Sequence, residues 1–478
     1  MEFEPVICFE IHAELKTGSK LFCGCPVEPN ALANSHICPV CTAQPGSLPV
    51  LNKRAVELCV MAGLAFNSRI NPRAIFARKN YFYPDLPKGY QISQYEYPLC
   101  EGGYVEITAD DGKPYHVGIK RIHLEEDAGK LVHTGDGHTL VDFNRAGVPL
   151  IEIVSDHERN PIRSLREARE YLETVRQTLQ YIGVSDCIIE QGQFRCDVNI
   201  SLRRRSERGF NDRVEIKNMA SFRFVLEALG YEIKRQSDIL NSGKRVVQET
   251  RHFDEKKKVT IPMRTKEDAP DYRYFPEPDL VELSIDAAFI SQIKERMPEL
   301  PSEKVNRFVE RYGISKKDVL ILTKERGVAD YFEECAKYSK DYKRLSLWII
   351  NELFRLLKDS SVSIKECPVS ARDFSELINL ISEGTITEQI AKSVLDEMFS
   401  TRKTAQRIIQ EKGIKVVQEE DILERMAQEI IEENPETVQK IKAGRLEAVN
   451  FLVGQAMKRT KGQANAKLMR RIFMQKLS

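Results

Sequence analysis

The stretch ICFEIHAEL, residues 7–15, alternates apolar side chains at the odd positions with Cys, Glu, His and Glu at the even positions. The stretches FRCDVNISLR (residues 194–203) and VEIK (residues 214–217) repeat this alternation. Successive side chains of a strand point to opposite faces, so each stretch predicts a strand with one face in a core and one face in water. Several such strands together predict an antiparallel or mixed sheet with one open face.

Helical patterns interrupt the strands and then dominate the second half of the chain. The sequence SLRE, residues 164–167, is a capping box, and the amphipathic run that it opens stops at Gly183. A second helix is predicted from Ser221 toward Leu240. Beyond residue 300 a helical period prevails, and only 3 of the 21 prolines lie there. We therefore predict an α+β fold in which helices follow a sheet.

Length, charge and apolar content limit the classes of protein that fit. The 478 residues correspond to about three domains at roughly 150 residues each. With 72 basic and 71 acidic residues, any affinity for nucleic acid must come from local clustering. No apolar run is long enough for a membrane span and no leader pattern begins the sequence, so we expect a cytoplasmic protein that has no contact with membranes.

Two cysteine pairs, Cys23-Gly-Cys25 and Cys38-Pro-Val-Cys41, have a spacing that is typical of a metal site. Such pairs can place four thiolates tetrahedrally around Zn²⁺. Four thiolates leave no open position for a substrate, so we predict a structural role for the zinc. The alternative is four unrelated thiols, and His36 could replace one ligand.

The polar faces of the predicted strands carry acids together with cations. Carboxylates in such an arrangement can hold Mg²⁺ while the cations hold phosphate oxygens, as phosphoryl transfer requires. The alternative is an ordinary solvated face of a sheet. The residues of interest are Glu10, His12, Glu14, Glu125, Glu126, Asp127, Asp142, Glu152, Arg195, Asn199 and Lys217.

Two basic segments could contact phosphates. Residues 78–91 mix basic and aromatic side chains with prolines, which suits either a base-stacking, phosphate-holding loop or a rigid loop packed on its own tyrosines. The 31 residues after Glu447 hold seven cations and no acid, which suits contacts to a nucleic-acid backbone or a solvated helix face. These cations are Lys458, Arg459, Lys461, Lys467, Arg470, Arg471 and Lys476.

The remaining cysteines lack the neighbours that an activated nucleophile needs, so they are interpreted as packing thiols. We therefore expect that this chain does not itself release ammonia from glutamine. The cysteines concerned are Cys59, Cys100, Cys187, Cys335 and Cys367.

Seven long motifs are distributed along the chain: RKNYFYPDLPKGYQISQ (78–94), HLEEDAGK (123–130), DFNRAGVPLIEIVS (142–155), RCDVNISLR (195–203), VEIKNMASF (214–222), DYRYFPEPDL (271–280) and FLVGQAMKRTKGQAN (451–465). They resemble those of one known family, the B subunits of the bacterial aspartyl/glutamyl-tRNA(Asn/Gln) amidotransferase, a tRNA-dependent enzyme. The resemblance covers essentially the whole chain. Two departures are Met219-Ala220, where the family usually has Leu-Asn, and Ala466, where it usually has Pro.

The resemblance implies a ligase that forms a carbon–nitrogen bond with glutamine as the amide donor. A member of this family would use Mg-ATP to phosphorylate the side-chain carboxylate of Glu on Glu-tRNA(Gln) or Asp on Asp-tRNA(Asn). Ammonia from the partner amidase (glutaminase) would then displace phosphate, and a small third subunit would hold the other two together. The alternative is a non-catalytic subunit that only binds tRNA as a scaffold.

The resemblance also implies a domain order and roles for particular residues. A cradle-shaped catalytic domain (residues 1–293) with the zinc knuckle would precede a helical domain (294–405) and a small helical tail (406–478). Glu10, His12 and Glu125 resemble the Mg²⁺ ligands of the family, with Glu152 as a fourth catalytic residue and Glu126 as a neighbour. The positions that match nucleotide-site motifs are Lys79, Tyr81, Arg195, Asn199 and Lys217. In the tail, Lys458, Arg459, Lys461, Lys467, Arg470 and Arg471 would contact tRNA.

Overall fold

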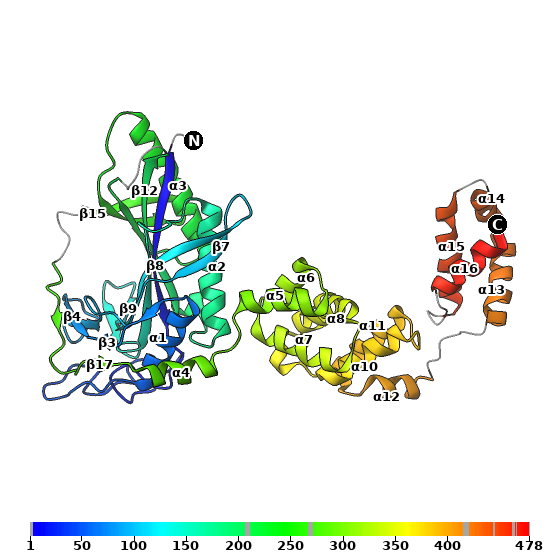
Figure 1. Ribbon diagram of the computed structural model, residues 1–478, viewed down its shortest axis with the longest axis horizontal. Helices are drawn as coiled ribbons and strands as arrows, with labels where there is room; N and C mark the ends of the chain where they lie inside the picture. The colour runs from blue at the N-terminus through cyan, green and yellow to red at the C-terminus, as the bar shows by residue number, and fades with distance from the viewer. Residues whose placement is uncertain are drawn as a thin grey trace. The chain divides into compact units, whose positions relative to one another are not determined.

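The structure is a computed structural model that describes residues 3–205, 211–265, 271–413, 420–442, 445–460, 464 and 466–477. The chain divides into two compact units, Met1–Leu300 and Pro301–Ser478. Strands and helices form the first unit, and helices form the described part of the second (Figure 1). The predicted α+β fold is thereby confirmed. The domain limits at residues 293 and 405 stay predictions.

A mixed ten-stranded sheet is the centre of the first unit. Its neighbours are antiparallel, except for the parallel pair β13 and β14. Strand β7 (Tyr104–Thr108) pairs with β8 beside the main path. From edge to edge the order is β15 (Val259–Thr265), β14 (Glu249–Asp254), β13 (Val214–Lys217), β12 (Phe194–Arg204), β1 (Phe3–Glu14), β11 (Pro149–Ser155), β8 (Pro114–Glu126), β6 (Cys100–Glu101) and β2 (Arg69–Ile70).

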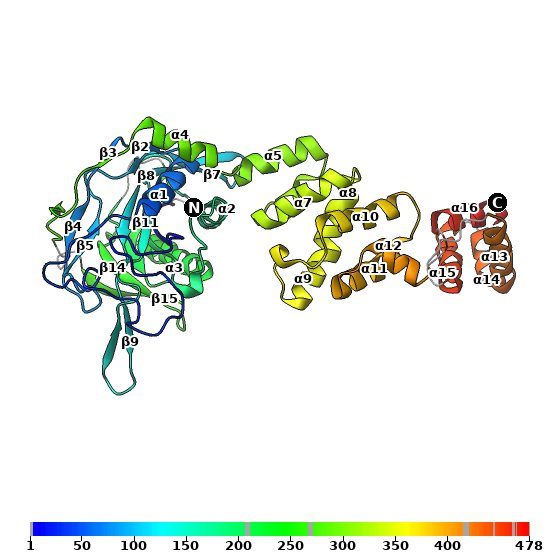
Figure 2. The ribbon, with the colours of Figure 1, turned by 90° about the horizontal axis from the view of Figure 1, so that it is seen from below.

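Three helices cover the apolar face of this sheet: α1 (Lys53–Ala65), α2 (Leu165–Tyr181) and α3 (Phe222–Asn241) (Figures 1 and 2). The odd-numbered side chains of β1 enter this core, where the ring of Phe9 stacks on Tyr171 at 5.7 Å. Burying this apolar surface is the main favourable term in holding sheet and helices together.

Both predicted helices of the first unit begin at their capping residues. The Ser164 hydroxyl accepts a hydrogen bond from the backbone N–H of Glu167 at 3.0 Å, and Ser221 caps α3 in the same way. The Glu167 carboxylate reaches back to the backbone N–H of Arg163 at 2.8 Å. Side-chain acceptors thus satisfy N–H groups that have no partner within the helix.

The polar face of the sheet lies under a second, three-stranded sheet of β4 (Ala77–Asn80), β5 (Tyr90–Ser93) and β16 (Phe275–Pro276) (Figure 2). The backbone N–H of Ile92 in β5 donates to the Glu126 carboxylate at 2.9 Å. The expectation of an open face is therefore wrong at its centre, because this small sheet excludes water from it.

Short elements complete the first unit. The hairpin of β9 (Lys130–His133) and β10 (Thr139–Asp142) follows β8, and β3 (Arg73–Ala74) pairs with β17 (Leu283–Ser284). The remaining elements are η1 (Ile189–Gln191) and α4 (Ala287–Arg296), which packs against α1.

The second unit contains two groups of helices. Those of the first group are α5 (Pro301–Tyr312), α6 (Lys316–Leu322), α7 (Arg326–Tyr338), α8 (Tyr342–Trp348), η3 (Ile349–Leu353), α9 (Phe354–Ser360), η4 (Ile364–Glu366), α10 (Ala371–Ser382), α11 (Glu388–Thr401) and α12 (Ala405–Glu411). The last helices share a core of their own and are α13 (Glu420–Glu433), α14 (Pro435–Lys442), η5 (Leu446–Ala448), α15 (Val449–Arg459) and α16 (Ala466–Leu477). Among the described residues, no helix is both long and apolar enough to cross a bilayer.

Candidate functional site

Strand register gathers three of the predicted site residues on the buried polar face. His12 of β1 pairs across the sheet with Glu152 of β11, which pairs in turn with His123 of β8. Glu125 lies two residues further along β8, on the same face. The Nε2 atom of His12 is 3.3 Å from a Glu125 oxygen and 3.7 Å from a Glu152 oxygen. We call His12, Glu125 and Glu152 the His–Glu cluster.

A fourth residue, His123, belongs to the same arrangement and was not predicted as a site residue. Its Nε2 atom is 3.3 Å from Glu152 and 3.7 Å from Glu125. Its Nδ1 atom is buried and has no hydrogen-bond partner. The spacing of His123 and Glu125, two positions apart in a strand, was the signal that could have placed the imidazole on the site face.

The two imidazoles and the two carboxylates stabilise one another's charged forms. Burial by itself would lower the pKa of His12, but the hydrogen bond with Glu125 and the charge of Glu152 raise it to about 9. Burial would likewise lower the pKa of His123, yet the nearby carboxylates of Glu152 and Glu125 raise it. Burial opposes ionisation of Glu125 and Glu152, but the histidines hold the pKa of each below its usual range. The cluster therefore favours the ionised form of two carboxylates that are themselves almost inaccessible to solvent, beside a partly exposed His12.

The donor set of the His–Glu cluster fits a divalent cation. One ligand atom from each of its residues can be chosen so that all lie within 4.8 Å of one another. Carboxylate oxygens suit Mg²⁺, and an imidazole nitrogen adds a ligand of a kind that transition metals also accept. Glu10 lies one cross-strand row away, opposite Val154, and is not in this group. Its carboxylate accepts a hydrogen bond from the Asn199 amide at 3.1 Å.

The small sheet places Lys79 and several tyrosines over the cluster. Burial would lower the pKa of Lys79, but the charges of Glu125 and Glu152 and the nearby tyrosines together raise it. The ammonium also lies 4.9 Å from the centre of the Tyr272 ring. Burial raises the pKa of Tyr81 to about 12, so the phenol stays protonated beside Tyr272. A cation and neutral hydroxyl-bearing rings thus face the two carboxylates.

Other cations of the predicted nucleotide site are held by acids of the same face. Arg195 donates two hydrogen bonds to Asp127, at 2.9 and 3.0 Å. Lys217 lies 2.7 Å from Asp197 and 3.0 Å from Glu215. Asp127 is one of the predicted acids of this face. Asp197 and Glu215 were not predicted as site residues, although the strand alternation puts them on the face of Arg195 and Lys217.

The loop of residues 78–91 is rigid and self-packed at its base but exposed at its tip, so each of the two predicted interpretations fits one part of it. Arg78 donates to both oxygens of Glu277 at 2.7 and 2.8 Å and stacks on Tyr90, so it holds the loop together. Lys88 forms an ion pair with Glu126. Phe82, in contrast, is 87% exposed at the tip. The base of the loop is therefore a rigid support for Lys79, and its tip is free to contact a ligand or partner.

The four predicted zinc ligands meet in one place. The Sγ atoms of Cys23, Cys25, Cys38 and Cys41 all lie within 4.8 Å of one another, which fits a tetrahedral metal site. The alternative ligand His36 is outside this group, with its Nε2 atom 3.7 Å from Glu28. The cluster can therefore hold a structural metal, and four thiolates are compatible with zinc.

A buried lysine accompanies the thiols. The side chain of Lys20 is inaccessible to solvent, and its ammonium lies 3.5 Å from the Cys41 sulfur and 3.1 Å from the Phe143 carbonyl oxygen. A hydrogen bond from Cys23, the backbone N–H of Cys38 and the charge of Lys20 lower the pKa of Cys41 to about 4 although burial opposes this. Cys41 therefore favours the thiolate, the form that binds metal, whereas the hydrogen bond with Cys41 raises the pKa of Cys23 and burial raises that of Cys25 to about 11.

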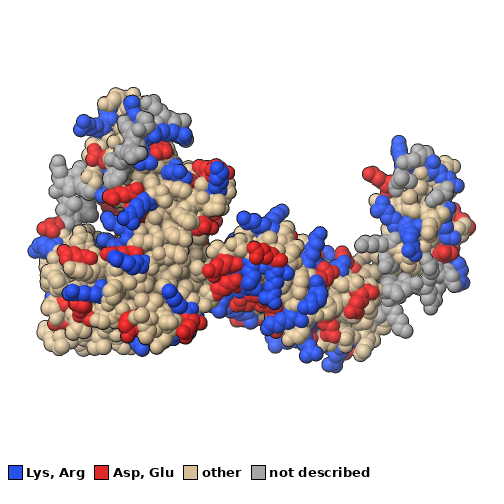
Figure 3. Space-filling view, in the orientation of Figure 1, with Lys and Arg blue, Asp and Glu red and all other residues tan. Residues whose placement is uncertain are grey.

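The predicted tRNA-contacting cations of the tail differ in their surroundings. Lys458 and Arg470 are exposed. Arg459 forms ion pairs with Glu429, at 3.2 Å, and with Glu433. Lys461 and the Lys467 side chain lie outside the described residues, and Arg471 is exposed. In Figure 3 the visible face of α5–α12 carries Lys and Arg interspersed with Asp and Glu, so no single sign of charge prevails there.

Comparison with known proteins points to one family along the whole chain. The family described as GatB/GatE catalytic domain matches residues 5–291, and the family described as GatB domain matches residues 330–477. Three curated relatives are named as B subunits of aspartyl/glutamyl-tRNA(Asn/Gln) amidotransferases. The relative from Thermodesulfovibrio yellowstonii is 49% identical over 473 residues, which are 99% of each chain. The relatives from Carboxydothermus hydrogenoformans and Persephonella marina are each 48% identical to this chain, and both alignments cover 100% of it. The alignment covers 99% of the first relative and 100% of the second.

Proposed function

The chain belongs to the family of aspartyl/glutamyl-tRNA(Asn/Gln) amidotransferase B subunits, and we propose that it activates the side-chain carboxylate of an amino acid esterified to tRNA. The substrate is Glu-tRNA(Gln), Asp-tRNA(Asn) or both. ATP supplies the phosphoryl group, and ammonia then displaces phosphate to give Gln-tRNA(Gln) or Asn-tRNA(Asn). The enzyme as a whole is a ligase that forms a carbon–nitrogen bond with glutamine as the amide donor.

The chemistry explains why activation is needed. A carboxylate is a poor acyl donor, since its leaving group would be oxide. Transfer of a phosphoryl group to the side-chain oxygen creates an acyl phosphate, and attack by ammonia then forms the amide bond and releases inorganic phosphate. An acyl phosphate hydrolyses readily, so the site must exclude water until ammonia arrives.

One observation carries the proposal: the His–Glu cluster brings two buried carboxylates and a partly exposed imidazole close enough together to hold a cation. Glu125 is 2% exposed and Glu152 is 8% exposed, although both belong to the polar face of a sheet. A bound Mg²⁺ would supply positive charge to the phosphoryl oxygens. His12, Glu125 and Glu152 would hold this ion, and Glu10, the other predicted ligand, has one carboxylate oxygen that accepts from Asn199 and a second oxygen that it can offer.

The remaining polar residues position the substrates in this proposal. Lys79 faces the carboxylates and can donate to a phosphate oxygen or to the substrate carboxylate. Tyr81 offers a protonated hydroxyl at the same place. Three further side chains, those of Arg195, Asn199 and Lys217, donate to acidic partners on the same face. In this proposal they donate to phosphate oxygens instead when a nucleotide binds in place of those acids.

We also propose the assembly in which this activation occurs. The partner amidase (glutaminase) releases ammonia from glutamine, which agrees with the lack of an activated cysteine context in this chain. A small third subunit completes the enzyme. The exposed cations Lys458, Arg470 and Arg471 of the tail, together with Arg459, Lys461 and Lys467, contact the tRNA backbone, and the four cysteines hold a structural zinc.

The cluster is tested with Glu125→Gln and His12→Ala in the full chain assembled with its partner subunits. Both variants should lose turnover of Glu-tRNA(Gln) or Asp-tRNA(Asn) by on the order of 100-fold or more, because the groups that place and neutralise the phosphoryl group are gone. Binding of tRNA, measured by filter retention, should be unchanged. The control Glu106→Gln changes an exposed acid of β7 that pairs with His116 at 3.0 Å, and it should keep full turnover.

The second candidate, a scaffold that only binds tRNA, rests on the exposed cations of the tail. It requires that both cluster variants retain the turnover of the unchanged enzyme. That result would move the activation step to another member of the assembly.

A further inference from the structure

The cysteine loop, residues 23–44, is hydrogen-bonded to one distant segment, residues 142–147, which we call the clamp segment. The backbone N–H of Asn34 donates to the Asp142 carboxylate at 3.0 Å, and the Asn34 side chain accepts from the backbone N–H of Phe143 at 2.8 Å. Asn34 has a φ of 59°, in the left-handed region that asparagine tolerates better than most residues. The turn at Asn34 therefore holds the cysteine loop against the clamp segment.

Asn144 joins the same two segments from the other direction. Its side-chain oxygen accepts from the backbone N–H of His36 at 2.9 Å, and its amide nitrogen donates to the Leu32 carbonyl oxygen at 2.7 Å. These two partners lie on either side of Asn34 in the sequence. Because both ends of the Asn144 amide are bonded, this side chain fixes the distance between the two backbones.

Lys20 connects the clamp segment with the sulfur ligands themselves. Its ammonium lies 3.5 Å from the Cys41 sulfur and 3.1 Å from the Phe143 carbonyl oxygen. The backbone N–H of the next residue, Leu21, donates to the Gly147 carbonyl oxygen at 2.8 Å. Gly147 has a φ of 85°, which strains residues that carry a Cβ atom. The clamp segment is thus attached both to the cysteine loop and to the residues that lead into it.

The opposite side of the clamp segment reaches the turn that follows β8. Arg145 donates to two carbonyl oxygens of this turn, that of Ala128 at 3.0 Å and that of Gly129 at 2.7 Å. Its Nε atom lies 3.6 Å from the Asp127 carboxylate. The backbone N–H of Gly147 also donates to the Asp127 carbonyl oxygen at 2.9 Å. The clamp segment therefore holds both the backbone of this turn and its acidic side chain.

Asp127 transmits this order to the polar face of the large sheet. Its carboxylate accepts two hydrogen bonds from Arg195, at 2.9 and 3.0 Å, and the residue is only 6% exposed. A buried carboxylate that contacts two guanidinium groups has few alternative positions. The orientation of Arg195 therefore depends on where the clamp segment holds Asp127.

We propose that Asn144 and Arg145 are positioning residues that couple the order of the cysteine loop to the reaction face. Residues 23–44 contain turns but no helix or strand, so no continuous ladder of backbone hydrogen bonds holds them. A metal bound by the four cysteines would tie this loop together at four points. With the metal bound, the clamp segment is fixed and the Asp127–Arg195 pair keeps one orientation; without the metal, both are loosened.

This coupling differs from a stabilising effect on the whole first unit. A metal that only stabilised the fold would slow the opening of every part of the unit alike, whereas the contacts of the clamp segment predict a local effect. The effect should reach the clamp segment and the turn after β8 and spare the rest of the sheet. Only the catalytic consequence of the coupling rests on the proposed function.

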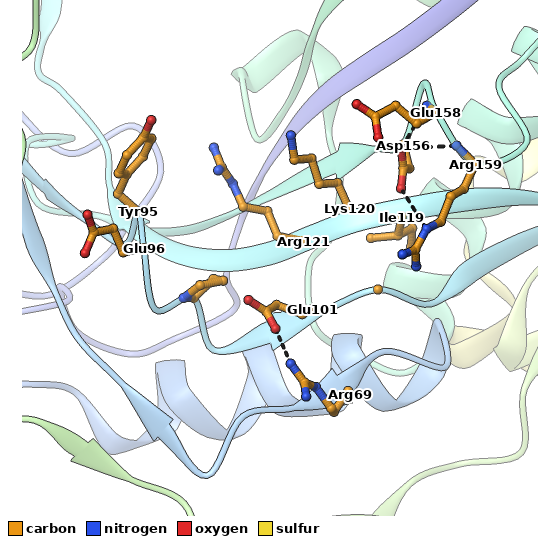
Figure 4. Close-up of a pocket in the computed structure, with 12 residues that line it drawn as sticks. Arg69, Tyr95, Glu96, Glu101, Ile119, Lys120, Arg121, Asp156, Glu158 and Arg159 are labelled. Atoms are coloured by element: carbon orange, nitrogen blue, oxygen red, sulfur yellow. Dashed lines mark hydrogen bonds and ion pairs between the residues drawn. The ribbon is translucent and has the colours of Figure 1, made fainter. Parts of the chain in front are cut away.

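Hydrogen exchange tests the coupling in the full chain, assembled with its partner subunits, loaded with Zn²⁺ and then treated with a zinc-selective chelator. Removal of zinc should speed exchange about tenfold or more in residues 127–129 and 142–147. The internal reference is the loop after β11, where the Asp156 carboxylate accepts from the backbone N–H groups of Glu158 at 2.9 Å and Arg159 at 3.3 Å (Figure 4). Exchange in this loop should stay the same. If exchange in residues 142–147 does not change either, the inference is overturned.

Asn144→Ala removes the joint without altering a cysteine. Exchange in residues 142–147 should already be fast with zinc bound, and removal of zinc should add little, because two changes that break the same connection are not additive. The KM for Mg-ATP should rise about two- to tenfold, with a smaller change in kcat, as expected for one or two lost hydrogen bonds that position a donor. The matched control is Asn379→Ala, which removes a comparable bond to the Tyr338 carbonyl oxygen, at 3.0 Å, in the second unit. It should change neither exchange nor KM.

Arg145→Gln and Arg145→Lys test the other end of the connection. The first removes the charge beside Asp127 and should raise the KM for Mg-ATP, whereas the second keeps the charge and should recover part of the loss. Both leave the cysteines and their loop unaltered, so the zinc content should equal that of the unchanged enzyme. A role confined to stability would lower the free energy of unfolding and leave the KM the same. Equal KM values in Asn144→Ala, Arg145→Gln and the unchanged enzyme would therefore overturn the positioning role.

Failure of this inference is distinguishable from failure of the proposed function. Exchange is measured without turnover, so it reports the coupling even if His12→Ala and Glu125→Gln keep full activity. Lost turnover in those two variants, together with exchange in the clamp segment that does not respond to zinc, would refute the coupling and leave the proposed function intact.

Discussion

Single residues in this protein acquire their chemistry from neighbours that are distant in sequence. Lys20 is an example, because a lysine is rarely buried without a charged partner. Its ammonium lies beside the Cys41 sulfur and is separated from bulk water by the surrounding loop. Four thiolates with one Zn²⁺ carry two negative charges, so the lysine offsets part of the charge that burial would otherwise penalise.

Replacing Lys20 by Met keeps the length of the side chain but removes its charge. We expect metal affinity to fall by roughly 10- to 100-fold, the usual effect of removing a partner that supports the ligands. Competition with a chelator, followed by metal analysis of the full chain, measures this. Lys16→Met is the control, since Lys16 is exposed and pairs with Asp186 at 2.7 Å. Equal metal affinity in the two variants would show that Lys20 does not stabilise the site.

At the scale of elements, a buried ionic network fastens the edge of the large sheet to helix α3. Glu232 of α3 is inaccessible to solvent and accepts hydrogen bonds from Arg235 at 2.9 Å and from Gln236 at 3.0 Å. Arg251 of β14 lies 3.3 Å from the same carboxylate, and Thr260 of β15 also donates to it. One carboxylate thus connects a helix with two strands.

Glu232→Ala would leave Arg251 buried without this carboxylate. We expect the free energy of unfolding of the first unit to fall by about 3–5 kcal/mol, as for other broken buried ion pairs. Urea denaturation followed by circular dichroism measures the change, and hydrogen exchange should show faster opening of β14 and β15. The control is Asp238→Ala at an exposed position of the same helix, for which a change within about 0.5 kcal/mol is expected. Similar unfolding curves for both variants would contradict the role of the network.

At the scale of the whole molecule, the chain combines a sheet-based unit that carries the candidate chemistry with a helical unit that ends in a basic segment. The two units differ in what their surfaces offer. Buried charges define the site of the first unit, whereas the tail cations Lys458 and Arg470 are exposed. Contacts to a nucleic-acid backbone need such exposed charges and are weakened by salt.

Charge reversal in the tail tests this division. Lys458→Glu together with Arg470→Glu should weaken tRNA binding, and the slope of log affinity against log salt should fall by about 1 for each phosphate that is no longer bound. Arg459→Ala should have a smaller effect, because Glu429 and Glu433 already partner this side chain. Binding titrations at several salt concentrations measure both. If the double variant keeps the affinity and the salt slope of the unchanged chain, the tail does not contact tRNA.

The sequence alone determined the α+β class, the caps at Ser164 and Ser221, the cysteine quartet and the family. Each of these depends on spacing within a short segment: a period of two for a strand, a partner three positions after the cap, and two close cysteine pairs. Alternation also assigned Glu10, His12 and Arg195 to one face of a sheet. Local geometry repeats reliably along a chain, so such patterns can be recognised without knowing the fold.

Only the tertiary structure decided which of these polar residues meet and whether water reaches them. Cross-strand register placed His123 with Glu152 and left Glu10 with Asn199, and no single segment encodes that register. The packing of β5 over β8 buried a face that alternation predicts to be wet. Burial and proximity arise from contacts between segments far apart in the chain, and these contacts set the charge states on which the candidate chemistry depends.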